Sequence, residues 1–316
     1  MSRRALRRLG SCAWLAACGA DEKAGLDVIP CVDLSPDARV EKLVFAAQDS
    51  EGDDRIYRVD RGGGGLCRMG EPPKDSEAGW ERAPAWSADS AAVAFAADLD
   101  LGPGIYRADP DGQGRLLVQA GELDDPAWSP SGGNLWASQR LPSGGSELVR
   151  FAAGGGSLRL ETETGADGDA HRRPAPHPDG GSVALEAVRS GVAGIWLLQL
   201  DEDGGLNEPA LLLEGATAPA WRADGRALAF GWRGGIAAAP FIDGALGPVQ
   251  PLEGLAGATV GPPTWSAEGD RLGFSTDLLG LEDLFSATPE GEALQQLTSG
   301  PGDKREPDWS RSALGG

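Results

Sequence analysis

The sequence is poor in the residues that most often bind metals or act as nucleophiles. It has only two histidines, His171 and His177, which are too few for a His-rich metal centre. No GxSxG motif is present, so the nucleophile elbow of one large hydrolase class is missing. The glycine runs at 62–65 and 154–156 are not followed by GK[ST], and we interpret them as turns, not phosphate-binding loops. We therefore expect no cofactor and no enzyme activity.

Positive charge is also scarce. The chain has 28 Lys and Arg against 48 Asp and Glu, which gives a formal net charge of −20. This balance excludes nucleic acid as a partner, because the phosphate backbone requires a basic surface. It also argues against docking on anionic lipid headgroups. The acidic clusters Asp109/Asp111 and Asp201/Glu202/Asp203 could bind Ca²⁺, but neither completes an EF-hand loop, and we interpret them as turn residues.

The chain shows no long helical period, but it contains a repeat. A short phrase recurs as APAWS, DPAWS, APAWR, PPTWS and EPDWS, and a degenerate copy reads RPAPHPDGG. With His177 placed in the Trp slot of the degenerate copy, the markers lie 42 to 49 residues apart. A fixed period in this range indicates a repeat architecture. The markers are Trp86, Trp128, His177, Trp221, Trp265 and Trp309.

Each repeat predicts four short strands. In the unit that begins at Ala83, the phrase is followed by a turn, a VAF strand at 93–95, an IY strand at 105–106, the turn ADPDGQG at 108–114 and a final RLLV strand. Turn signals every 8 to 12 residues are typical of an all-β fold. Six strand pairs of the VAF/IY type can be counted. The orphan phrase at 306–310 then supplies the missing strand of the first unit and closes the ring.

These residues resemble a known family. The pattern PxWSPDG, then LAF, then IY is similar to the TolB-type, WD40-like propeller repeat of bacterial envelope proteins, over about residues 42–310. The resemblance implies an all-β, six-bladed β-propeller of TolB-like repeats over 41–311, with a tail at 312–316. The third and fourth units depart from the pattern. The separate α/β domain that precedes the propeller in TolB is not expected here, so the TolB role does not transfer directly.

The N-terminus has the features of a bacterial export signal. Four arginines precede a short apolar run, Leu9 to Ala17, which is far too short to span a membrane. Leu15 to Cys18 resembles a lipobox, which predicts a lipoprotein signal peptide at 1–17, lipidation at Cys18 and a polar tether over 18–40. An ordinary secretory signal and the twin-arginine route are the alternatives. Gly19 after the lipid site favours, by resemblance to sorting rules, the periplasmic face of the outer membrane.

Two further cysteines remain once the leader is removed and Cys18 carries the lipid. Cys31 lies in the tether and Cys67 in the last strand of the first unit. An even remainder in an oxidising compartment favours a disulfide between them, with two unpaired thiols as the alternative. The bridge would pin the tether to the propeller.

The repeated tryptophans predict packing between blades and not a binding platform. Trp80 and Trp232 lie outside the marker position and are better candidates for a surface contact. The function we expect is that of a non-catalytic, monomeric envelope lipoprotein that binds a protein or peptide partner and touches the membrane only through its lipid. The alternatives are a carbohydrate-active or hydrolytic propeller using channel carboxylates, for which we single out only Asp308, and a Ca²⁺- or small-ligand-binding module.

Overall fold

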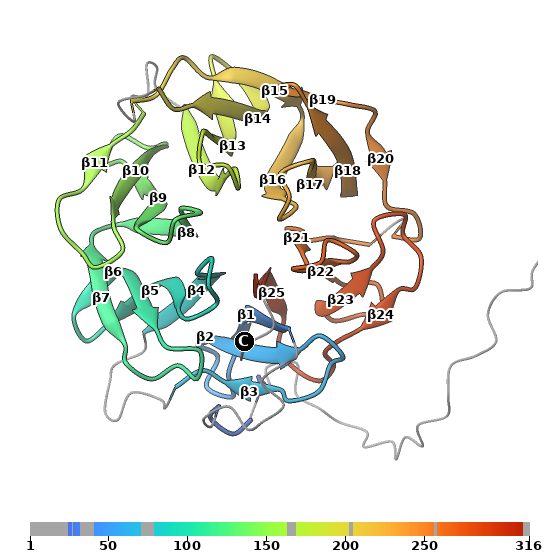
Figure 1. Cartoon of the computed structure of the whole chain (residues 1–316). Coiled ribbons are helices and arrows are strands. Elements are labelled where there is room, and N and C mark those ends of the chain that lie inside the picture. Colours follow the sequence, from blue (N-terminus) through green and yellow to red (C-terminus); the bar gives the residue numbers. More distant parts are fainter. Residues whose placement is uncertain are drawn as a thin grey trace, which may run out of the picture.

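The computed structural model describes residues 25–26, 28–31, 41–70, 79–162, 169–201, 205–255 and 258–311. Within these ranges the chain folds into short strands and turns and contains no helix. The all-β prediction is confirmed. Accordingly, no described segment is a helix long and apolar enough to cross a membrane. Figure 1 shows the sheets standing side by side around a central axis, each with one edge toward the centre.

The strands follow one another from the centre outward in each sheet, as the repeat predicts. The first sheet has the order β25 (Lys304–Trp309), β1 (Lys42–Gln48), β2 (Asp54–Asp60) and β3 (Cys67–Arg68). The second contains β4 (Trp80–Trp86), β5 (Val93–Leu99), β6 (Gly102–Ala108) and β7 (Leu116–Ala120). Neighbouring strands within these two sheets are antiparallel.

Two further units share one eight-stranded sheet, because a single parallel pair, Ser146 with Ala170, joins them. One unit contains β8 (Leu123–Trp128), β9 (Asn134–Arg140), β10 (Ser146–Ala152) and β11 (Arg159–Leu160). The other contains β12 (Ala170–Pro176), β13 (Ser182–Arg189), β14 (Val192–Gln199) and β15 (Ala210–Glu214).

The remaining strands form two more sheets. One contains β16 (Ala216–Trp221), β17 (Ala227–Trp232), β18 (Gly235–Ile242), β19 (Ala245–Leu246) and β20 (Gln250–Pro251). The other contains β21 (Thr264–Trp265), β22 (Leu272–Thr276), β23 (Asp283–Ala287) and β24 (Gln295–Gln296).

The last of the described strands pairs with the first. β25 runs antiparallel to β1, with Leu43 opposite Trp309 and Ala47 opposite Lys304. The pairing is extended by the Ser310 amide, which donates to the Lys42 carbonyl at 2.8 Å. The orphan phrase therefore supplies the inner strand of the first sheet (Figure 1).

The repeated tryptophans pack between neighbouring sheets, as predicted. Trp86, Trp265 and Trp309 are buried. Three indole N–H groups also donate to a backbone carbonyl in the sheet before their own, at 2.9 to 3.0 Å: Trp128 to Ala85, Trp221 to Ala175, and Trp265 to Ala220. Each such residue both fills the space between two sheets and ties their inner strands together.

The placement of His177 in a Trp slot was wrong. Pro176 lies opposite Val183, as Trp86 lies opposite Val93, so Pro176 occupies that slot. His177 takes the turn position of Ser87 one residue later. Its Nε2 lies 3.0 Å from the carbonyl oxygen of Gly225, and its ring meets the edge of Trp221 at 4.6 Å between centroids. His177 therefore has a packing and turn role.

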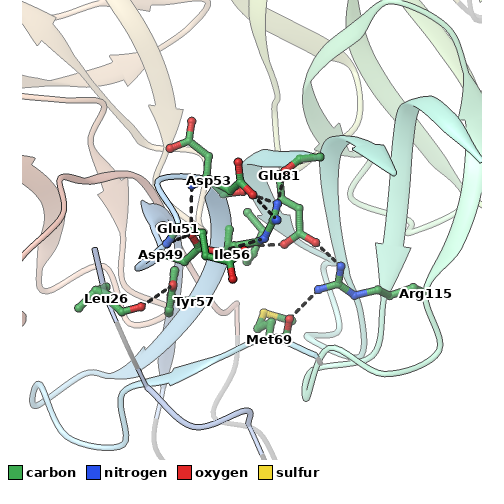
Figure 2. A network of polar contacts seen from close by, with 12 residues as sticks. Leu26, Asp49, Glu51, Asp53, Ile56, Tyr57, Met69, Glu81 and Arg115 are labelled. Carbon is green, nitrogen blue, oxygen red and sulfur yellow. Dashed lines mark hydrogen bonds and ion pairs between the residues drawn. The ribbon is translucent and has the colours of Figure 1, made fainter. Parts of the chain in front are cut away.

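Part of the segment predicted as a tether packs against the first sheet. The Leu26 amide donates to the Gln48 carbonyl at 2.8 Å, and the Tyr57 hydroxyl donates to the Leu26 carbonyl at 3.2 Å (Figure 2). Further along, the Cys31 amide donates to the Arg68 carbonyl at 2.7 Å. Cys31 and Cys67 form a disulfide with Cα atoms 5.0 Å apart. Where it is described, this segment is an added layer on the sheet and not a free linker.

A buried carboxylate joins the first two sheets. Glu81 on β4 is 1% exposed. Its Oε2 accepts the Ile56 amide of the first sheet at 3.1 Å, and its Oε1 pairs with Arg115. Arg115 in turn donates to the Met69 carbonyl at 2.6 Å (Figure 2). Every charge in this group has a partner, which is the condition for burying it without a large loss of stability.

Candidate functional site

The innermost strands enclose a cavity of about 450 Å³ on the central axis. It is lined by β4, β8, β12, β16 and β25, by the segment 262–264, and by the turns that follow the repeated phrase. Most lining side chains are proline, alanine or tryptophan. The charged lining residues are Asp125, Arg173, Glu306, Asp308 and Arg311.

The prolines of the repeated phrase explain why the cavity has an apolar wall. One proline of each copy is buried at the same position: Pro84, Pro126, Pro174, Pro219, Pro263 and Pro307. An inner strand has no neighbour on its central side, and proline lacks the N–H that such an edge would leave unpaired. The same residue therefore protects the edge strand and builds an apolar surface around the axis.

The residue before the proline has a left-handed backbone in five copies. The φ angles are 48° at Ala83, 50° at Asp125, 47° at Arg173, 48° at Ala218 and 54° at Glu306. In each case the ladder to the next strand shifts register close to this residue. Such a bulge bends the inner strand and takes its amides out of the ladder. A non-glycine residue in this conformation is strained. All five of these strained residues line the cavity.

Carboxylates accept the amides that the bulges release. The bonds run from Ala83 N to Glu306 Oε2 at 2.8 Å, from Trp86 N to Asp308 Oδ2 at 2.7 Å, from Arg173 N to Asp125 Oδ2 at 3.3 Å, and from Ala218 N to Glu186 Oε2 at 3.0 Å. In every case donor and acceptor belong to neighbouring units. These acids, Glu186 on β13 and the others on inner strands, thus connect neighbouring units and satisfy backbone donors.

Asp125 is the acid whose protonation is most affected by this setting. Loss of solvent, together with the negative charges of Asp124 and Glu306, raises its pKa to about 6, although the Arg173 guanidinium opposes the shift. Arg173 lies 3.2 Å from Glu186 and 4.0 Å from Asp125. The charge of Glu186 and Asp125 raises the pKa of Arg173 against the effect of burial, so it remains a cation.

The mouth of the cavity has its own polar group. Asp308 Oδ1 accepts from Thr264 Oγ1 at 3.1 Å and from Arg311 at 3.1 Å. Thr264 also accepts the Trp309 amide at 3.1 Å. This chain of bonds fixes one side of the mouth, where the first and last sheets meet.

The lining has few polar side chains. Among the described residues it contains no Ser, Cys, His or Lys, and the hydroxyl of Thr264 is engaged as described. Nowhere in the described ranges do three or more His, Cys, Asp or Glu residues come together in a way that could hold a metal ion.

The residues predicted from the sequence lie elsewhere, apart from Asp308. Cys18 lies outside the described residues. Cys31 and Cys67 lie on the outer part of the first sheet. Trp80 and Trp232 do not line the cavity; each stacks with an arginine, Arg82 at 4.2 Å and Arg233 at 5.0 Å.

The acidic clusters behave as turns where they are described. Asp111 accepts the Gln113 amide at 2.9 Å, and Asp201 accepts the Gly205 amide at 2.6 Å. These are local contacts that shape a tight turn, in agreement with the interpretation made from the sequence.

Sequence reasoning passed over Asp125, Arg173 and Glu306. A signal was available, because each stands directly before the proline of its repeated phrase. Only Asp308, two residues later, was singled out as a channel acid. The three missed residues occupy equivalent places on neighbouring or opposite inner strands, which the linear sequence shows only once the copies are aligned.

Comparisons with known proteins point to one group. No family model matches the chain. A 135-residue segment is 32% identical to the Tol-Pal system protein TolB of Anaeromyxobacter dehalogenans, and it covers 40% of this chain and 30% of that protein. The chain thus matches less than a third of the length of this curated relative.

Solved structures agree on the fold. TolB from Acinetobacter baumannii aligns with a TM-score of 0.70 and 19% identity over 85% of this chain and 66% of that one. The structure named putative TolB from Agrobacterium tumefaciens aligns with a TM-score of 0.62 and 20% identity, over 84% of this chain and 90% of that one. Oligogalacturonate lyase from Vibrio parahaemolyticus aligns with a TM-score of 0.51 and 12% identity, over 74% of this chain and 72% of that one. The chain therefore has a β-propeller fold like that of these TolB structures, and a lyase shares this fold.

Proposed function

We propose that this chain is a non-catalytic protein of the bacterial cell envelope whose propeller binds a protein or peptide partner through the central cavity. The cavity carries the proposal. Its volume of about 450 Å³ lies in the usual range of ligand sites, about 300 to 1,000 Å³. A wall of proline, alanine and tryptophan with a few charged groups can receive a side chain or a loop, and it offers no nucleophile. The relatives named as Tol-Pal proteins support an envelope protein as the partner.

The proposed architecture is a ring of six blades closed by β25. Its support is the pairing of β25 with β1 and two contacts from the C-terminal segment to the second sheet. Glu306 accepts the Ala83 amide at 2.8 Å, and the Arg311 amide donates to Ser90 Oγ at 3.0 Å. A closed ring would hold the cavity wall in one shape before a partner arrives, which reduces the cost of binding.

The proposed location is the periplasmic face of the outer membrane, with the lipid on Cys18 as the anchor and the protein as a monomer. The lipobox at Leu15 to Cys18 supports the anchor, and the resemblance to TolB supports the envelope. We further propose that Cys31 and Cys67 are disulfide-bonded in the mature protein, as the 5.0 Å between their Cα atoms allows.

The mouth of the cavity allows a direct test. Ala88 and Ala223 are exposed and line the mouth, so Ala88→Trp and Ala223→Trp should narrow it and leave the core unchanged. Ala91 lies on the same turn as Ala88, is exposed and does not line the cavity, which makes Ala91→Trp the matched control.

The measurement is chemical cross-linking in intact cells, followed by affinity capture of the full chain from detergent-solubilised envelope. We expect a defined cross-linked partner with the wild type and with Ala91→Trp, and its loss with both mouth variants. A partner retained by both mouth variants would show that the cavity is not the binding site.

A further inference from the structure

We propose that the cavity holds a cationic side chain of the partner, an arginine, between the carboxylates of Glu306 and Asp125. This inference rests on the proposed function, since it names the group that would enter the cavity. Glu306 on β25 and Asp125 on β8 stand on either side of β4 (Figure 1). The equivalent residue on β4 is Ala83, whose methyl group leaves room between the two acids.

Each of the two carboxylates has one oxygen that accepts no hydrogen bond from the described residues. Glu306 accepts the Ala83 amide through Oε2, and its Oε1 has no hydrogen-bond donor among the described residues. Asp125 accepts the Arg173 amide and the Ser138 hydroxyl through Oδ2, both at 3.3 Å. Its Oδ1 lies 4.0 Å from Arg173 Nε, beyond hydrogen-bond distance. The bound oxygens fix the carboxylates in place, and the other two remain for a ligand.

The charges of the cavity do not cancel without a ligand. Arg173 lies closer to Glu186, at 3.2 Å, than to Asp125. Arg311 pairs with Asp308 at 3.1 Å. The charge of Arg173 also acts on Asp125 and Glu306, so one cation is shared by three carboxylates and a surplus of negative charge remains. Burial is the largest cause of the raised pKa of Asp125, and the negative charges of Asp124 and Glu306 add to it. A cation between the two acids would remove the repulsion.

The residues that line the cavity suit an organic cation better than a metal ion. Among the described residues no three His, Cys, Asp or Glu side chains converge as metal ligands. Around the two acids the wall is proline and alanine, which suits the apolar stem of a long basic side chain. A guanidinium group presents N–H donors in several directions of one plane and can bond two carboxylates together. A single arginine would therefore meet the apolar wall and both acids.

The test uses a pair of probes that differ in charge and hardly in shape. N-acetyl-arginine amide is titrated into the detergent-solubilised full chain, and its neutral analogue N-acetyl-citrulline amide is titrated in parallel. Binding is followed by NMR or calorimetry at pH 7.5. We expect the arginine probe to bind at least about 10-fold more tightly than the citrulline probe, because charge-assisted hydrogen bonds are roughly twice as strong as neutral ones. Equal affinity of the two probes, or no saturable binding of either, would overturn the proposal.

Substitutions of the two acids test whether the arginine probe binds between them. Glu306→Gln and Asp125→Asn should each weaken the arginine probe by about 10-fold and leave the citrulline probe nearly unchanged. Glu208 does not line the cavity, and its side chain is 95% exposed. Glu208→Gln is therefore the matched control and should bind the arginine probe as the wild type does. If one variant fails to fold, the other variant and the comparison of probes in the wild type still decide. An unchanged arginine affinity in a folded Glu306→Gln or Asp125→Asn protein contradicts the assignment.

The outcome separates this inference from the proposed function. Loss of the cross-linked partner in the mouth variants, with no preference for the arginine probe, would retain the function and reject the cationic site. A strong preference for the arginine probe, with the partner kept by the mouth variants, would retain the site and reject the function.

Discussion

At the scale of single residues, the inner wall shows how one position of a repeat can carry different chemistry in different copies. The backbone before the proline is the same left-handed bulge in Ala83, Asp125 and Glu306. The side chain at that position differs between the copies: it is a methyl group at Ala83 and a carboxylate at Asp125 and Glu306. A rigid, repeated backbone therefore presents a varied set of side chains around one axis, which is how a propeller acquires a specific site.

The raised pKa of Asp125 has a consequence for stability. Its pKa in the folded protein is about 6, above the value of about 3.9 in an unfolded chain. The folded state therefore binds the proton more strongly, and stability falls as pH rises from about 4 through 6. The groups that set this balance are Asp124, Arg173 and Glu306.

Asp125→Asn should remove this pH-dependent loss. We expect the variant to gain on the order of 1 to 3 kcal/mol relative to the wild type at pH 7.5 and to show little gain near pH 4. The Asn side chain keeps an oxygen that can accept the Arg173 amide. Urea unfolding at the two pH values measures the difference, and an equal effect of the substitution at both would contradict the assignment.

At the scale of elements, the segment around Cys31 is the least expected part of the fold. The sequence suggested a tether, but Leu26 and Cys31 are buried against the first sheet. The segment has no repeat pattern of its own, and its contacts include backbone bonds to Gln48 and Arg68 and a bond from the Tyr57 hydroxyl. A disulfide adds to these contacts by limiting the unfolded chain.

The disulfide prediction can be checked directly. Peptide mapping of the mature protein under non-reducing conditions should show Cys31 joined to Cys67. Cys67→Ser should lower the free energy of unfolding by about 3 to 4 kcal/mol, because the bond closes a loop between residues 36 positions apart. Free thiols at both positions in secreted protein would contradict the prediction, and addition of reductant to the Cys67→Ser variant should have no further effect.

The elements themselves were largely predictable, and the site was not. The phrase around Trp86 and the apolar run at 93–95 predicted an inner strand and its neighbour, because turn signals and strand residues act locally. The degenerate copy was misread by one residue at His177, since without a tryptophan only the strand pairing of Pro176 shows the alignment. The cavity could not be predicted, because it depends on which copies become neighbours in space.

At the scale of the whole molecule, the last strand contacts both the first and the last sheet. β25 supplies Trp309, which is fully buried, and Lys304, which is also buried and lies 3.0 Å from Asp283 of the last sheet. It pairs with β1 of the first sheet. The strand therefore connects the first and last sheets, through its backbone on one side and its side chains on the other.

Truncation before Glu306 should damage the fold far more than loss of an ordinary tail. Removal of a buried tryptophan costs about 3 to 5 kcal/mol, a large share of the ~5 to 15 kcal/mol that stabilises most domains, and β1 would gain an open edge that favours aggregation. Thermal unfolding and size-exclusion chromatography measure both effects. Truncation after Arg311 is the control and should behave as the full chain. A chain that ends at residue 305, stays monomeric and melts within a few degrees of the wild type would rule out closure by β25.

Anchoring is the second prediction at this scale. Cys18→Ala should abolish labelling with a fatty-acid analogue and move the protein from the membrane fraction to a soluble or precursor form. Two or more acyl chains hold a protein on a membrane stably, since each buried methylene contributes about 0.8 kcal/mol. Cys12→Ala, in the predicted leader, is the control and should keep both the label and the membrane fraction. A wild type that takes up no label would reject the lipoprotein assignment.

The place where the N-terminal segment joins the propeller gives the molecule a polarity. Gly25 lies against the Asp49 carbonyl and close to Gly302, at the end of the first sheet where β25 begins. The cavity is lined by Glu306 to Asp308, later on β25, and by Arg311 just beyond the strand. The attachment point and the cavity thus occupy opposite ends of the same strand. If Cys18 carries a lipid, only six residues separate it from Gly25, so the cavity would open away from the bilayer. A partner would then approach from the side of the periplasm that faces away from the anchoring membrane, and it could bind without competing with that membrane for the same face.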